Sequence, residues 1–395
     1  MTAKLFEPLA LGPLELPNRI VVAPMCQYSA SGGSADADWH TQHLMTLAMS
    51  GAGLIVVEAT GVEPRGRITH GCLGLYNEAN EAALARALAA ARRVAPKGTR
   101  FGIQLAHAGR KASAQLPWQG GQPLEPEADA WTTVAPSAIA FGDGWPDPRA
   151  LDDKGLATVR GAFVQAARRA AQIGFDAVEL HAAHGYLLHE FLSPVSNRRN
   201  DAHGGTAEGR MRFPLSVVEA VRAALPAGIP LGLRITGSDW VEGGLTPADA
   251  VQFAAACKAK GAAFVCVSSG GIAANVTVPF APNYQVPFAE RVRKETGMTT
   301  RAVGLIAQPE QAEAIVRDGK ADQVALARSL LDNPRWPWHA AEKLGVDLDY
   351  PPQYLRVKAK LWPGAKLARP PEARGGGVIG PSEIQLDGKT TSCVR

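Results

Sequence analysis

The sequence has little of several features that mark other protein classes. Its 395 residues include five cysteines and no C-x-x-C pair, which argues against a disulfide scaffold and against a zinc or iron–sulfur cluster. No apolar run approaches the roughly 20 residues of a membrane span. Residues 1–11 contain Lys4, Glu7 and Pro8 and lack the apolar core of a signal peptide. We therefore expect a soluble, cytoplasmic protein without a membrane partner.

An excess of charge of one sign is also missing. The chain has 41 Lys and Arg against 37 Asp and Glu, a net charge of +4, and it has no basic block. Because nucleic-acid binding needs a concentrated basic surface, nucleic acid is not an expected partner. The composition, with 46% hydrophobic and 20% charged residues, is that of a globular protein.

Short apolar runs alternate with longer helical patterns along the chain. The runs are rich in Val, Ile and Leu and lack polar alternation, which is typical of parallel strands buried on both faces. They predict strands at 20–23, 54–58, 101–105, 177–180, 231–235, 264–267, 301–303 and 323–326. Helices are predicted at 81–94, 156–173, 210–224, 247–260, 288–296 and 309–317. Thr246 and Pro247 supply a helix start, and Gly174 and Gly261 supply helix ends.

Eight strands alternating with helices form either a closed parallel barrel or an open doubly wound sheet. No G-x-G-x-x-G follows the first strand, so the dinucleotide-binding open sheet loses support. We predict the α/β class and a (β/α)8 TIM barrel over 1–356, with its active site on the loops after the strands. The long connection at about 107–153 is expected to be a lid or a rigid cap, and 357–395 a C-terminal extension, flexible or loosely docked.

The segment after the fourth predicted strand is the richest in chemistry. His181 and His184 are three residues apart, so on a helical turn they would share a face and could together donate to one electron-rich oxygen. Tyr186 could give a proton to a carbon acid. The alternatives are a zinc site, which lacks the H-E-x-x-H spacing, and ordinary structural histidines. We predict no metal.

Other polar residues fall at the ends of the first and fifth strands. Cys26 follows the first strand and could be a nucleophile, a tuning contact or an inert thiol, with Tyr28 beside it. Arg234 interrupts an apolar strand, which predicts an electron-rich partner in the barrel mouth. The alternative is an ion pair with Glu58 or Glu179.

The last two strands carry the signal for a phosphate. Gly304 follows the seventh strand and Arg328 the eighth, where barrels often bind phosphate on backbone N–H groups. Ser268 and Gly270 follow the sixth strand and allow close backbone approach. A cofactor with a phosphate is therefore expected.

Together these residues resemble the Old Yellow Enzyme family of flavoproteins, specifically its thermophilic-like ene-reductase class, which includes xenobiotic reductases. The resemblance covers roughly 4–356. Its most specific segments are 23–28, 104–111, 135–139, 181–194 and 197–205, and the pair Cys26 and Tyr28 marks the subclass.

The resemblance implies an enzyme that transfers hydride from NADPH or NADH, through FMN, to the C=C bond of an activated alkene. It implies FMN contacts from Ala23, Pro24, Met25, Cys26, Ala59, Gln104, Arg234, Ser268, Gly270, Gly304, Ala327 and Arg328. It assigns proton donation to Tyr186, carbonyl binding to His181 and His184, and a substrate contact to Tyr28. It also implies a homodimer or homotetramer in which Arg356 reaches the neighbouring active site.

Three other readings stay open at the level of sequence. One is an FMN enzyme that reduces uridine in tRNA, which would need a basic surface. Another is a flavin-free lyase or isomerase acting on a phosphate substrate, which would need a Lys or a catalytic carboxylate at a strand end. The last is a binding barrel without catalysis.

Overall fold

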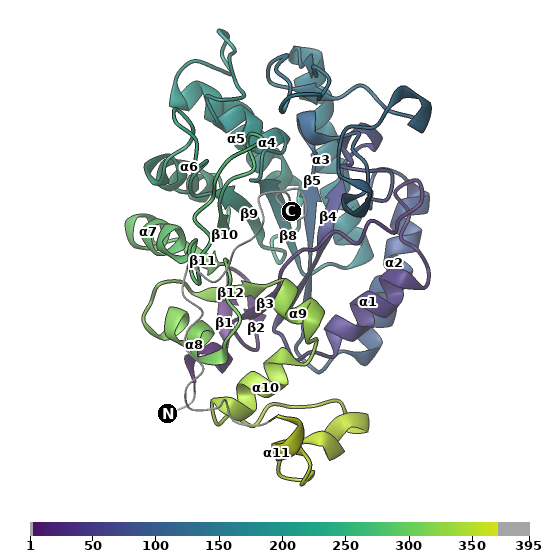
Figure 1. Ribbon diagram of the computed structural model, residues 1–395, viewed down its shortest axis with the longest axis vertical. Helices are drawn as coiled ribbons and strands as arrows, with labels where there is room; N and C mark the ends of the chain where they lie inside the picture. The colour runs from purple at the N-terminus through teal and green to yellow at the C-terminus, as the bar shows by residue number, and fades with distance from the viewer. Residues whose placement is uncertain (1–2, 370–395) are drawn as a thin grey trace.

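The computed structural model describes residues 3–369, and these fold around a closed parallel barrel (Figure 1). The barrel confirms the predicted fold, because all eight predicted strands are present and pair in chain order. They are β3 (Ile20–Val22), β4 (Leu54–Gly61), β5 (Arg100–Ala106), β8 (Ala177–Ala182), β9 (Leu231–Thr236), β10 (Phe264–Ser268), β11 (Thr299–Ala302) and β12 (Gln323–Leu326). Nearly every position in them is buried, as expected for strands covered on both faces.

The six predicted helices are also present, extended by up to three residues at their starts. They are α2 (Glu78–Val94), α3 (Asp153–Ile173), α5 (Ala207–Ala224), α6 (Pro247–Ala259), α7 (Val286–Thr296) and α8 (Pro309–Arg317). The added residues follow side-chain caps: Asn77, Asp152 and Thr206 each accept a backbone N–H of the first turn. Gly174 ends α3 in the left-handed conformation, at φ 97°.

Several elements were not predicted. They are α1 (Trp39–Ala48), α4 (Leu187–Leu192), α9 (Arg328–Asp332), α10 (Trp336–Lys343), α11 (Ala365–Ala368) and the hairpin β1 (Leu9–Leu11) with β2 (Leu14–Leu16). Short 3-10 helices add η1 (Lys4–Phe6), η2 (Pro64–Gly66) and η6 (Pro352–Val357). The hairpin packs Leu11, Leu14 and Leu16 against inward-facing barrel residues such as Val21 and Phe264, so it covers one end of the barrel.

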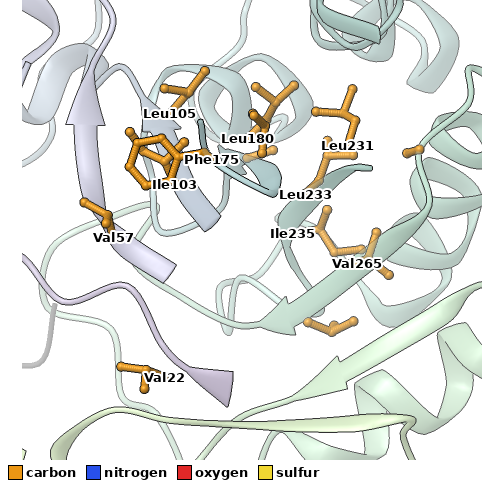
Figure 2. Packing of buried hydrophobic residues seen from close by; sticks show 14 of the residues in the cluster. Val22, Val57, Ile103, Leu105, Phe175, Leu180, Leu231, Leu233, Ile235 and Val265 are labelled. Atoms are coloured by element: carbon orange, nitrogen blue, oxygen red, sulfur yellow. The ribbon is translucent and has the colours of Figure 1, made fainter. Parts of the chain in front are cut away.

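Alternate strand residues point outward to the helices and inward to the barrel axis. Figure 2 shows part of the outer layer, including Ile103, Leu105, Leu231, Leu233 and Ile235. Each strand residue between these points inward, since side chains alternate along a strand. Within residues 3–369, no helix combines the length and apolar composition that crossing a bilayer requires.

The connection between β5 and α3 is built from short elements. It contains η3 (Gly109–Lys111), η4 (Pro117–Gln119), η5 (Pro126–Ala128), β6 (Val134–Ala135) and β7 (Arg149–Ala150). Its base is held by Arg199, which donates to the carbonyls of Pro136 (2.9 Å) and Leu151 (2.6 Å). Trp131 Nε1 donates to the Arg65 carbonyl (3.0 Å). The role of this segment as a lid or a cap stays a prediction.

The chain after the barrel packs on α10, below the barrel in Figure 1. Trp338 stacks on Tyr350 with ring centroids 4.1 Å apart, and Arg369 pairs with Glu342 (2.7 Å). Lys358 pairs with Asp347 (2.6 Å). Of the predicted extension 357–395, the part up to 369 is therefore docked, and 370–395 lie outside the described residues.

Candidate active site

The predicted site residues gather at one end of the barrel, where the parallel strands finish. His181, Arg234 and Ser268 lie in the last residues of β8, β9 and β10. Ala59 follows an irregularity in the pairing of β4 with β5, and Gln104 lies opposite it on β5. The loops after β3, β10, β11 and β12 supply the others: Ala23, Pro24, Met25, Cys26, Tyr28, Gly270, Gly304, Ala327 and Arg328.

His181 and His184 are neighbours, but the expected helical turn between them is wrong. His181 belongs to β8, and His184 lies after the strand in a turn with φ 59°. Gly185 follows at φ 73°. The chain reverses here through left-handed backbone, because β8 must end at the mouth before α4 can begin. The ring centroids of the two histidines are 5.1 Å apart.

The hydrogen bonds of these imidazoles form one directed chain. The Ala183 N–H donates to His181 Nδ1 (3.2 Å), which leaves the proton of a neutral His181 on Nε2. That nitrogen lies 3.3 Å from His184 Nδ1, and His184 Nε2 lies 2.6 Å from Ser268 Oγ. Ser268 in turn donates to Gln285 Oε1 (2.9 Å). Each ring thus has one acceptor and one donor nitrogen.

Both imidazoles are neutral at neutral pH. Burial lowers the pKa of each well below its ordinary value, and the nearby charges of Arg234 and Lys111 lower it further. A neutral ring that keeps its N–H can donate to an electron-rich oxygen without bringing a charge. The two N–H groups already make hydrogen bonds to His184 and Ser268, so an incoming oxygen would exchange for these bonds.

Tyr186 completes this cluster. It precedes α4, is 4% exposed, and its ring meets the His181 ring edge-on with centroids 4.7 Å apart. Lys111 Nζ lies 5.1 Å from the Tyr186 ring centroid and donates to the Gly271 carbonyl (2.7 Å). Lys111 ends the family-like segment 104–111, and the sequence alone gives it no role in the site. Its burial at 0% exposure is visible only in the fold.

Cys26 is a protonated thiol. Burial raises its pKa well above the ordinary value, and the nearby Glu58 carboxyl raises it further. Glu58 lies 3.3 Å from His40 Nε2 and accepts the Gln27 N–H (3.0 Å). A thiol held protonated is a poor nucleophile, so the structure favours the contact or inert alternatives for Cys26.

Tyr28 lies beside Cys26 in left-handed backbone, at φ 52°. Its ring meets Trp118 edge-on, with centroids 5.9 Å apart. Trp118 comes from the 107–153 connection and is 66% exposed. Burial raises the pKa of Tyr28, so its hydroxyl stays protonated and available as a donor.

Arg234 has no ion-pair partner within residues 3–369. Its Nε is buried and makes no hydrogen bond there. The alternative partner Glu179 is taken by Arg301 Nη1 (2.8 Å) and Gln104 Nε2 (2.7 Å). A partly buried guanidinium whose Nε lacks a hydrogen bond is costly. These residues therefore fit an electron-rich group such as the FMN ring, which would supply the missing acceptor.

The predicted phosphate residues lie around the starts of the last loops. Gly304 has φ 112°, and a Cβ there would lie 3.0 Å from Gln285 Nε2. Ala327 has φ −108°, a conformation open to alanine, and Arg328 begins α9 with an exposed side chain. Gly270 has φ 74°. The Ser268 hydroxyl, by contrast, is engaged by His184 and Gln285.

Arg356 is not part of this cluster. It lies in η6, in the segment docked on α10, and its side chain is exposed. Arg335 anchors this segment by covering the rings of Trp338 (4.4 Å) and Tyr354 (4.2 Å). Within residues 3–369, Arg356 makes no side-chain hydrogen bond or ion pair with the predicted site residues.

Known proteins resemble this chain over most of its length. Residues 4–347 match the model of the NADH:flavin oxidoreductase / NADH oxidase family. The chain is 42% identical over 357 residues to an NADPH dehydrogenase from Geobacillus thermodenitrificans (strain NG80-2), which covers 90% of this chain and 99% of that protein. It is 41% identical over 356 residues, with the same coverage, to an NADPH dehydrogenase from Listeria innocua serovar 6a (strain ATCC BAA-680 / CLIP 11262).

Among solved structures, the chain is similar to morphinone reductase. The TM-score is 0.71 and the identity 31%, over 89% of this chain and 93% of that one. These matches remove the flavin-free lyase and the non-catalytic barrel from the readings left open by the sequence. The chain belongs to the NADH:flavin oxidoreductase / NADH oxidase family, and it is an oxidoreductase of the Old Yellow Enzyme type that works with FMN and a nicotinamide cofactor.

Proposed function

We propose that this enzyme is an ene-reductase. Its substrates are α,β-unsaturated carbonyl compounds, and the hydride comes from NADPH or NADH by way of FMN. One observation carries the proposal: two neutral imidazoles, His181 and His184, lie against each other, and the His181 ring meets the phenol of Tyr186 edge-on. This combines donors for an oxygen with a proton source for the adjacent carbon.

FMN would be held by the residues around the mouth. When bound, it supplies the hydride transfer between nicotinamide and alkene. The ring and its side chain would contact Ala23, Pro24, Met25, Cys26, Ala59, Gln104 and Arg234. The phosphate would lie near Ser268, Gly270, Gly304, Ala327 and Arg328, where Arg328 offers a charged donor. Cys26, as a neutral thiol, would lie against the ring and adjust its potential.

His181 and His184 would bind the carbonyl oxygen of the substrate. As hydride arrives at the β-carbon, negative charge develops on that oxygen. Two N–H donors stabilise this charge, each by about 3 kcal/mol if well placed. Because both rings are neutral, the oxygen gains hydrogen bonds without a proton being transferred to it by an imidazolium.

Tyr186 would protonate the α-carbon. Its ring is buried and fixed between His181 and Lys111, so its hydroxyl is held at one place relative to the oxygen site. General-acid groups of this kind contribute about 10²- to 10⁴-fold in rate. Tyr28, in the loop after β3, would contact the substrate from another side of the same mouth.

The exposed Arg356 would complete a neighbouring active site in a homodimer or homotetramer. Its placement away from its own mouth supports a role between subunits. The 107–153 connection would then act as a lid on the 1–356 unit, since Trp118 already touches Tyr28.

Stopped-flow kinetics of Tyr186→Phe tests the proposal. Reduction of the flavin by NADPH should persist, while reoxidation by cyclohexenone slows about 10²-fold or more, because only the second step needs the proton. His181→Ala should lose both alkene turnover and affinity for a phenol that mimics the oxygen.

Two results would contradict the proposal. One is a wild-type enzyme that consumes NADPH but never in response to an enone. The other is a Tyr186→Phe enzyme whose two half-reactions both keep their wild-type rates. Phe163→Leu, a buried change on α3, serves as the control for a general loss of packing.

A further inference from the structure

The turn that carries His184 and Tyr186 needs to be held in place. His184 has φ 59°, which residues other than glycine rarely adopt, and Gly185 follows at φ 73°. Gly185 packs so closely on the Gly271 carbonyl that a Cβ would overlap it. Lys111 donates to the His184 carbonyl and so fixes one side of this turn. The N–H of Gly185, on the other side of the turn, needs an acceptor as well.

A fully buried histidine holds the N–H of Gly185. His189, two residues into α4 from its start at Leu187, has 0% exposure, and its Nδ1 accepts the Gly185 N–H at 2.8 Å. The Gly185 peptide lies directly between the two residues assigned to oxygen binding and proton donation. The N–H of this peptide therefore donates to a side chain of the next helix, α4.

Asp239, in the loop after β9, fixes the other side of this imidazole. His189 Nε2 lies 2.9 Å from Asp239 Oδ1, and both side chains are 0% exposed. Asp239 Oδ2 accepts the Ser193 hydroxyl (2.7 Å) and the Leu245 N–H (2.7 Å). Oδ2 thus accepts two hydrogen bonds, and Oδ1 lies within ion-pair distance of the imidazole.

These contacts determine where the proton of His189 lies. Since Nδ1 accepts from a backbone N–H, a neutral ring carries its proton on Nε2, the nitrogen that lies 2.9 Å from Asp239 Oδ1. Burial alone would raise the pKa of Asp239, but His189, the Leu245 N–H and Ser193 lower it overall, so the carboxylate stays ionised. An ionised Asp239 selects this tautomer.

A nucleophilic triad does not explain the arrangement. Ser193 donates to Asp239 and not to His189, so the imidazole cannot take its proton. All three side chains are fully buried, and no substrate reaches them. Instead, the Asp239 carboxylate orients the His189 imidazole, and this imidazole accepts the Gly185 N–H.

We propose that His189 and Asp239 are positioning residues for the reaction: Asp239 fixes the tautomer of His189, whose Nδ1 then holds Gly185 and with it the His184–Tyr186 turn. The inference rests on the proposed function for its effect on turnover. The hydrogen bond itself can be tested separately.

Paired substitutions at His189 distinguish positioning from packing. His189→Leu removes the acceptor and keeps an apolar side chain, whereas His189→Asn keeps an acceptor oxygen at the place of Nδ1. His189→Leu should bind 4-hydroxybenzaldehyde about tenfold more weakly and reduce enones about tenfold more slowly, as expected for one lost hydrogen bond. His189→Asn should restore both to within about threefold of wild type.

Two further measurements control for stability. Val159→Ala, at a fully buried site on α3, should lower the melting temperature without changing phenol affinity. Exchange of the Gly185 amide with deuterium should be faster in His189→Leu than in wild type, and this readout does not depend on turnover. The proposal is overturned if phenol affinity and Gly185 exchange in folded His189→Leu match wild type, or if His189→Asn is as defective as His189→Leu.

If His189→Leu fails to fold, histidine-labelled ¹⁵N spectra of the intact holoenzyme decide the matter. In wild type, Nδ1 of His189 should be unprotonated, and in Asp239→Asn the two tautomers should mix. A wild-type Nδ1 that carries the proton overturns the proposal. An enzyme inert towards every enone would sink the proposed function, while the tautomer, the phenol affinity and the Gly185 exchange would still test this inference.

Discussion

Two arginines of the barrel strands differ in whether the protein itself supplies an anionic partner: Arg301 has one, and Arg234 has none within residues 3–369. Arg301 and Arg234 lie on the two strands that flank β10, and each is a register partner of Cys266. Arg301 is fully buried and its Nη1 pairs with the Glu179 carboxylate at 2.8 Å, while its Nη2 makes no hydrogen bond within residues 3–369. Arg234 has no ion pair within the described residues, and its buried Nε has no hydrogen bond there.

This difference separates residues that hold the barrel together from residues kept for a ligand. Glu179 serves Arg301 and also accepts from Gln104 Nε2 (2.7 Å), which leaves Gln104 Oε1 free of that carboxylate. The Glu179 carboxylate thus pairs with the buried charge of Arg301 and also orients the side chain of Gln104. At the mouth, the Nε of Arg234 has no hydrogen-bond acceptor within residues 3–369. We expect the bound cofactor to provide one.

The largest expected effect comes from breaking the closed pair. Arg301→Met should lower the free energy of unfolding by about 3–5 kcal/mol, because it leaves the Glu179 carboxylate buried without its partner. Denaturant unfolding of the enzyme in excess FMN measures this loss. The double variant Arg301→Met with Glu179→Leu should recover most of it, since both charges are then gone. Equal stability of the single variant and wild type would contradict the contrast drawn above.

A smaller effect is expected at the open arginine, and it should appear in cofactor affinity. Arg234→Met should weaken FMN binding by about 1.5–3 kcal/mol, the usual value of a hydrogen bond from a charged group. It should weaken riboflavin binding equally, because Arg234 is assigned to the ring. The matched variant Arg328→Ala should weaken FMN but not riboflavin. Fluorescence titration of both ligands measures this, and an Arg234→Met enzyme that loses affinity only for FMN would refute the ring assignment.

A buried ionisable group, Glu190, has an effect that appears only as a dependence of stability on pH. One of its oxygens accepts the Arg110 N–H (2.8 Å), and the other makes no hydrogen bond within residues 3–369. Burial raises the pKa of Glu190 to about 8, from an ordinary value of 4.5. Between these values the folded protein keeps a proton that the unfolded chain loses. Its contribution to stability is therefore present below pH 4.5 and lost as the pH rises through 8.

Unfolding of wild type and Glu190→Gln from pH 5 to pH 8 measures this contribution. Glutamine resembles the protonated acid, so the variant should be free of a slope of up to about 1.4 kcal/mol per pH unit. Parallel stability curves for the two proteins would show that Glu190 titrates normally.

The fold was accessible from sequence because its signal is repeated eight times. Each barrel strand is a short apolar run without polar alternation, and burial on both faces makes that pattern unavoidable. Helix α1 is not predicted, although Leu44, Leu47 and Ala48 form an apolar stripe. The first buried residue of that stripe is a histidine, His40, and Asp38 provides no side-chain cap. The short α4 and α9 are set by the turns before them rather than by an apolar period.

The site was accessible only in part. Strand ends located His181 and Arg234, but the geometry joining His181 to His184 was wrong because left-handed backbone leaves no clear signal at a histidine. Lys111 and Asp239 were not assigned, since their roles depend on carbonyls and rings brought from distant parts of the chain. Pairing across the barrel, as for Glu179 with Arg301, likewise follows from register and not from local pattern.

The seam between Gly185 and Gly271 limits how the pocket can be redesigned. A Cβ on either glycine would meet backbone of the other loop, so neither loop can shift without carrying its neighbour. Libraries meant to admit bulkier compounds should leave both positions unvaried. The 107–153 connection, where Trp118 is two-thirds exposed, offers diversity at far lower risk to expression.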